Sequence, residues 1–114
     1  LYIFYIYYVT PRHYYFIFIQ GAFIMNKLIY SALFHKADEG GFWVSFPDFP
    51  ECLTQGASLW NAYEMARDAV KLAIISRLEN GEPLPASTDI HIFTSDTISL
   101  YVDITWESTY FKSV

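Results

Sequence analysis

Loosely alternating apolar and polar residues predict two strands joined by a glycine turn. Residues 28–36 (LIYSALFHK) form the first expected strand, and residues 42–46 (FWVSF) return as the second. Glycines at the turn supply positive φ at little steric cost. The two faces of the second strand are Phe42, Val44 and Phe46 on one side, and Trp43 and Ser45 on the other.

A proline-rich loop follows this hairpin. Residues 47–50 (PDFP) are expected to break the strand ladder, because proline has no N–H to donate. Cys52–Thr54 is predicted to be a short third strand that ends at Gln55-Gly56.

The clearest predicted element is a helix that begins after Ser58 and ends at Asn80-Gly81. Ser58 is a typical N-cap, and the prolines at positions 83 and 85 prevent continuation. The apolar residues recur at spacings of three and four, which predicts one buried stripe. The stripe consists of Leu59, Ala62, Tyr63, Ala66, Ala69, Val70, Ala73, Ile74 and Leu78.

Two more strands are expected after the helix. Residues 90–93 form a weak candidate, and residues 98–105 (ISLYVDIT) form a stronger one with clear alternation. The predicted fold class is therefore α+β: an antiparallel three-strand meander, one long helix packed on the sheet, and a further strand.

Residues 1–24 differ sharply from the rest of the chain. They contain six Tyr, five Ile and four Phe, with one Arg, one His and no acid. Three interpretations stay open: upstream DNA translated in frame before Met25, a membrane-associating hairpin or anchor, and a genuine extra strand pair. Thr10-Pro11-Arg12-His13 splits the apolar stretch into two runs, each too short for a transmembrane helix of about 20 residues.

The remaining chain is acidic. From Met25 onward there are six Lys and Arg against twelve Asp and Glu, and the whole chain carries a formal net charge of −5. This balance argues against nucleic-acid binding, which needs clustered cations. It suits a basic protein partner, although acidity that serves only solubility is an equal alternative.

No motif for catalysis, a metal or a cofactor is found. The sequence has no H-E-x-x-H, no G-x-S-x-G and no phosphate-binding glycine loop. Cys52 is the only cysteine, so it cannot form an intrachain disulfide, and an inert buried thiol is expected. His35 and His91 are expected to be strand or loop residues without a ligand. We therefore predict a non-enzymatic protein with no cofactor.

The run from Gly40 to Gly56 (GGFWVSFPDFPECLTQG) resembles the signature of the HicB antitoxin family. The resemblance continues through the helix alanines and the post-helix turn NGEPLP, and covers about residues 26–105. Two positions depart from the family pattern: Glu51 stands where glycine is usual, and Ala57 stands where an acid is usual. The domain division this implies is an extension at 1–24, a HicB-like domain at 25–105 and a C-terminal remnant at 106–114.

The resemblance implies a cytoplasmic antitoxin that binds and neutralises a HicA-type mRNA-cleaving toxin, and a sheet and helix similar to a reduced ribonuclease-H fold. It also implies a homodimer or higher oligomer, and no DNA binding by this chain, because residues 106–114 are too short for a DNA-binding domain. The alternatives are a solitary RNA- or protein-binding module, a hidden enzyme, or a decayed gene product. The residues expected to contact the toxin are Trp43, Asp48, Phe49 and Glu51, with core packing the alternative for Phe49.

Overall fold

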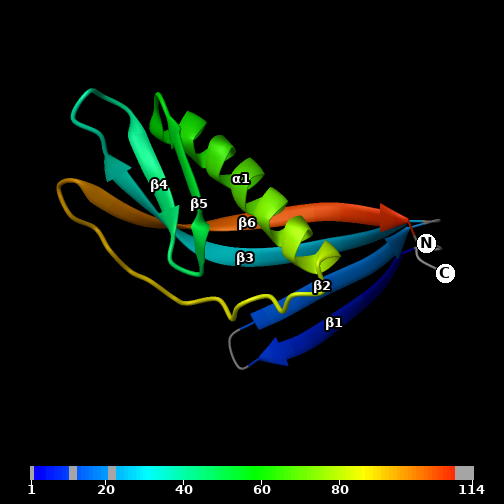
Figure 1. Cartoon of the computed structure of the whole chain (residues 1–114). Helices are drawn as coiled ribbons and strands as arrows, with labels where there is room; N and C mark the ends of the chain where they lie inside the picture. Colours follow the sequence, from blue (N-terminus) through cyan, green and yellow to red (C-terminus); the bar gives the residue numbers. More distant parts are fainter. Residues whose placement is uncertain (1, 11–12, 21–22, 110–114) are drawn as a thin grey trace.

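The computed structural model describes residues 2–10, 13–20 and 23–109, and the side chains of residues 27–105. It is one sheet with a single long helix lying across one face (Figure 1). The elements in chain order are β1 (Tyr2–Thr10), β2 (His13–Gln20), β3 (Phe23–Lys36), β4 (Phe42–Phe46), β5 (Phe49–Gly56), α1 (Leu59–Glu79) and β6 (Thr97–Thr109).

β3 is the central strand. It pairs with β6 over nearly its whole length, from Phe23 opposite Thr109 to His35 opposite Thr97. Since a strand has two edges, β2 and β4 share the other one, β2 beside residues 23–27 and β4 beside residues 33–36. All pairs are antiparallel, and β5 follows β4 at the end of the sheet. The predicted α+β class, with a three-strand meander, one helix and a further strand, is confirmed.

Two strand predictions need correction. The turn after β4 occupies only Pro47 and Asp48, and β5 already begins at Phe49. The register of β4 and β5 shifts between Ser45 and Phe46, and this irregularity accommodates the turn. The prolines therefore interrupt the strand pairing over a shorter stretch than expected. The weak strand expected at residues 90–93 is reduced to an isolated bridge between Phe93 and Ile98.

α1 forms where the sequence predicts it. The Ser58 hydroxyl accepts the N–H of Asn61 at 3.1 Å, and Gly81 ends the helix with a φ of 70°. Its buried positions are Ala62, Ala66, Val70 and Ile74, while the outermost stripe residues Leu59 and Leu78 are exposed. The core lies between α1 and the sheet, and its largest side chains are Tyr30, Phe34, Phe46, Phe49, Leu28, Ile74 and Ile104.

Residues 2–10 and 13–20 adopt an antiparallel strand pair that continues the sheet from β3. Such a strand pair is what the third interpretation of residues 1–24 describes. The origin of the segment stays a prediction. Of the expected C-terminal remnant, residues 106–109 belong to β6, and residues 110–114 lie outside the described part of the chain. Within the described part, no helix is both long and apolar enough to cross a membrane.

Candidate protein-binding site

The sheet has one face covered by α1 and one open face. Side chains alternate between the two faces along each strand, and the register places equivalent residues of neighbouring strands side by side. We call the side opposite α1 the open face; the segment after α1 reaches it where Ser99 Oγ bonds residues 90 and 92 and the Tyr101 hydroxyl donates to Asp89. It is formed by Leu33 and His35 of β3, Trp43 and Ser45 of β4, Leu53 and Gln55 of β5, and Thr97, Ser99 and Tyr101 of β6.

Trp43 is an aromatic residue held in place on this face. Its ring stacks on the imidazole of His35 with centroids 3.8 Å apart and an interplanar angle of 17°. His35 is held in turn by hydrogen bonds to Thr97 Oγ1 at 3.2 Å and to Ser45 Oγ at 3.0 Å. Burial lowers the pKa of His35, which favours the neutral ring. Trp43 is still 43% exposed, so it is both preorganised and accessible.

Asp48 joins the β4–β5 turn to the loop that follows α1. Its carboxylate accepts the Thr88 backbone N–H at 2.8 Å and the Thr88 hydroxyl at 2.6 Å. The same loop is fastened to the sheet by the Tyr30 hydroxyl, which donates to the Pro85 carbonyl at 2.7 Å. Asp48 therefore fixes the loop after α1 at Thr88.

Glu51 forms a bidentate ion pair with Arg77 near the end of α1. Arg77 Nε and one terminal nitrogen each donate to a Glu51 oxygen at 2.9 Å. These hydrogen bonds from Arg77 lower the pKa of Glu51, so the carboxylate stays charged to lower pH than usual. The Glu51 side chain is 48% exposed, which leaves part of it accessible to a partner.

Phe49 lies in the core. It is fully buried, its ring meets Tyr30 edge-on at 4.7 Å, and the Arg77 guanidinium lies 4.8 Å from its centroid. Phe49 therefore packs in the core, which is the alternative to toxin contact that the sequence left open for it. The four predicted residues separate into Trp43 on the open face and three residues gathered around the β4–β5 turn.

Several exposed apolar side chains were not singled out from the sequence. Tyr101 and Leu53 are 53% and 66% exposed on the open face. Within residues 98–105, Tyr101 alternates with the apolar core residues and shares its face with Ser99, so the sequence pattern already places it there. Trp60 and Phe93 are 68% and 85% exposed elsewhere, without a periodic signal that marks them. Among the described residues no three His, Cys, Asp or Glu gather closely enough to hold a metal ion. Burial raises the pKa of the Cys52 thiol to about 11, which agrees with an inert thiol.

Comparisons with known proteins give consistent results. The family model described as the HicB_like antitoxin of bacterial toxin–antitoxin systems matches residues 30–109. Antitoxin HicB 1 of Photorhabdus laumondii subsp. laumondii is 43% identical over 63 residues, which cover 55% of this chain and 41% of the relative. Antitoxin HicB of Escherichia coli strain K12 is 42% identical over 64 residues, covering 54% of this chain and 46% of the relative. The chain thus spans less than half of the length of these curated relatives.

A solved structure titled as a HicA3 and HicB3 toxin–antitoxin complex contains a similar chain. The two chains are 28% identical with a TM-score of 0.53, and the match covers 67% of this chain and 96% of that one. The matched part therefore corresponds to nearly all of the chain in the complex.

Proposed function

Since the chain belongs to the HicB-like antitoxins of bacterial toxin–antitoxin systems, we propose that it binds and neutralises a HicA-type mRNA-cleaving toxin. The observation that carries this proposal is the similarity to a chain of the HicA3 and HicB3 complex over 96% of that chain. Antitoxins are binding proteins rather than enzymes, so family membership also confirms the predicted absence of catalytic activity.

The toxin contact that we propose is centred on Trp43 of the open face. Binding energy at interfaces concentrates in a few aromatic anchors, and such anchors are most effective when they lose little freedom on binding. The stack on His35 and the two hydrogen bonds of that imidazole already fix the indole before a partner arrives. Leu53 and Tyr101 extend the exposed apolar surface on the same face.

Charge supports the same partner. A toxin that cleaves mRNA must neutralise phosphates with Lys and Arg, whereas this chain has a net charge of −5. Opposite net charges speed the encounter of two proteins. In this proposal Asp48 and Glu51 present fixed carboxylates to toxin cations, and Phe49 contributes indirectly by holding their turn in place.

Co-expression of the full chain with the product of the adjacent reading frame tests the role. We expect growth rescue and co-purification. Failure of both, with the chain shown to be folded, would refute the antitoxin role and favour an orphan HicB-like module or a decayed gene product.

Two tryptophans provide a matched test of the surface. Trp43→Ala should weaken toxin binding by about tenfold or more, because it removes a central anchor. Trp60→Ala removes an equally large and even more exposed ring from α1, and it should leave binding unchanged. Equal losses in the two variants would contradict the assignment of the contact to the open face.

The proposal extends to location and assembly. The chain would act in the cytoplasm, where mRNA is translated, and would self-associate into a dimer. Self-association is measurable without the toxin, so the two parts of the proposal can fail separately.

A further inference from the structure

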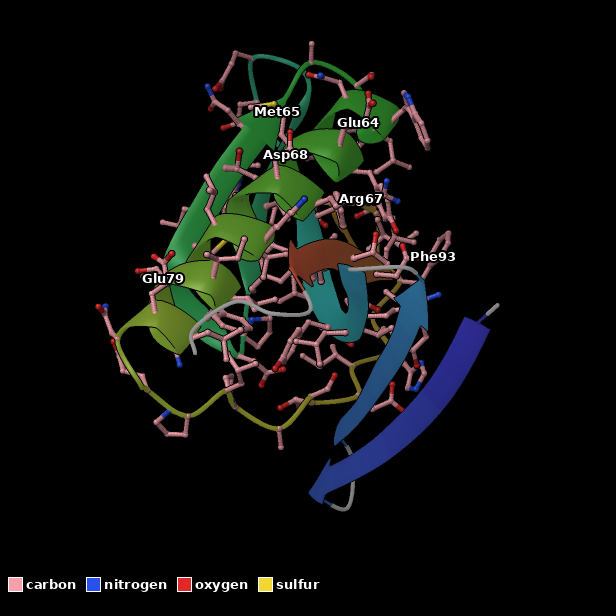
Figure 2. The ribbon with its side chains drawn as sticks, turned by 90° about the vertical axis from the view of Figure 1, so that its right-hand side faces the viewer. Glu64, Met65, Arg67, Asp68, Glu79 and Phe93 are labelled. Atoms are coloured by element: carbon pink, nitrogen blue, oxygen red, sulfur yellow. The ribbon has the colours of Figure 1, made fainter. Side chains whose placement is uncertain are left out.

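The open face contains one residue that titrates near neutral pH, His35. None of the other residues that form this face is Asp, Glu, Lys or Arg. Asp89 meets the face at Tyr101, and farther along it Lys27 pairs with Asp103 at 3.8 Å. Lys27 stands eight residues before His35, roughly 26 Å along the strand. The charged residues labelled in Figure 2 all belong to α1, on the other side of the sheet: Glu64, Arg67, Asp68 and Glu79.

The immediate contacts of His35 are also neutral. Its two ring nitrogens meet the hydroxyl groups of Thr97 and Ser45, and a hydroxyl can donate or accept. Lys36 follows His35 in the strand, so it belongs to the opposite face of the sheet. The Asp96 carboxylate, next to Thr97, accepts two hydroxyl groups of its own turn. Within the described part of the chain, a charge that forms on His35 thus meets no counter-charge among its printed contacts.

We propose that His35 is a positioning residue of the toxin contact, and that its protonation weakens toxin binding. The Trp43 ring stacks on His35 with centroids 3.8 Å apart, so a toxin that closes over the indole also removes water from the imidazole. An imidazolium loses stability when it is desolvated without a counter-charge, and a cationic toxin adds repulsion. This inference rests on the proposed toxin contact at Trp43 and adds the regulation of that contact by pH.

The effect arises in the complex, because the free chain can hold Trp43 in both protonation states. The hydroxyl oxygens of Ser45 and Thr97 can accept from a doubly protonated ring, and a cation stacks favourably on an indole. Burial already lowers the pKa of His35 in the free chain, and closure of the interface lowers it further. Above the pKa of the free chain the imidazole is neutral in both states, so affinity is constant. Below it, binding must expel a proton, and affinity falls as the pH falls.

Calorimetric titration of the full chain with the product of the adjacent reading frame tests this inference between pH 7.5 and pH 5.5. For the natural chain we expect constant affinity above pH 7, a loss of about threefold or more by pH 5.5, and proton release on binding at that pH. His35→Gln keeps a planar amide beside the indole without the titrating ring, so this loss should disappear. Groups of the toxin titrate equally with both chains, so the difference between the two profiles isolates His35. His35→Ala also removes the stack and should weaken binding throughout the range.

His91→Gln is the matched control, because His91 is the other histidine among residues 27–105. The His91 side chain is 75% exposed and its Nε2 lies 3.1 Å from a carboxylate oxygen of Asp89, so its charge is solvated and balanced. This variant should keep the profile of the natural chain, and circular dichroism at both pH values checks that every variant is folded.

The outcomes separate this inference from the proposed function. Binding at pH 7.5 with parallel pH profiles for the natural chain and His35→Gln, or a profile that His91→Gln flattens equally, would overturn the inference alone. Equal affinities of His35→Ala and His35→Gln at pH 7.5 would overturn the positioning role. A folded natural chain that does not bind at pH 7.5 would overturn the proposed function, and this inference with it.

Discussion

Replacing Phe49 with alanine tests whether this ring stabilises the fold or contacts a partner. Truncating a buried phenylalanine to alanine costs about 3–5 kcal/mol, through lost transfer energy and the cavity left behind. Phe49 is fully buried and also loses an edge-on contact with Tyr30 and a cation–π contact with Arg77. We therefore expect a loss near the middle of that range, about 4 kcal/mol, out of roughly 5–15 kcal/mol for a domain.

Urea unfolding followed by circular dichroism measures this loss. With a slope of about 2 kcal/mol per molar urea, a loss of about 4 kcal/mol lowers the midpoint by about 2 M. Trp43→Ala is the comparison, because a 43% exposed ring should cost only about 1 kcal/mol of stability while weakening toxin binding. A Phe49→Ala midpoint within about 0.5 M of the natural chain, together with lost toxin binding, would refute the assignment of Phe49 to the core.

Three further outcomes follow from single contacts. Glu51→Gln should cost about 0.5–1 kcal/mol at pH 7, because it breaks the partly exposed ion pair with Arg77. Since folding lowers the pKa of Glu51, this contribution is complete above the ordinary carboxyl pKa and disappears as the pH falls through the lowered value. Urea midpoints of both proteins should therefore converge in acid, and a constant gap would contradict the ion pair. Cys52, with a pKa raised to about 11, should react with a thiol reagent at pH 8 only after unfolding, and rapid labelling of the native chain would disprove its burial. Gly56→Ala should destabilise by about 2 kcal/mol or more, because the new Cβ would lie 2.3 Å from a backbone nitrogen of α1. Gly40→Ala, where a Cβ meets nothing within 4 Å, should lose only the roughly 1–2 kcal/mol of positive-φ strain in the same thermal or urea assay.

Local rules were sufficient for several elements. The Ser58 cap, the three- and four-residue spacing of alanines and the Asn80-Gly81 stop act over one or two helical turns, so α1 could be predicted almost residue by residue. Residues 42–46 became β4 for the same reason. The resemblance of residues 40–56 to the HicB signature likewise depends only on the order of residues along the chain.

Side-chain environment depended on contacts far apart in sequence. Phe49 lies between two prolines, so no alternation indicated whether it pointed inward, and its burial follows from Tyr30 and Arg77. Asp48 stands in a turn, and only the folded chain brings residue 88 beside its carboxylate. The weak strand at residues 90–93 failed because this segment bonds to the Ser99 hydroxyl instead of forming a ladder.

The sequence by itself determined the helix, the position of β4, most of β3 and β6, the acidic balance and the family resemblance, because these depend on neighbouring residues and on composition. Tertiary structure alone decided that Trp43 is fixed by His35, that Glu51 is held by Arg77, and that Phe49 lies in the core. Each of these facts requires residues from different strands or from the helix to meet. Local propensity cannot specify such meetings, which are fixed only when the strands take their register and the helix packs on the sheet.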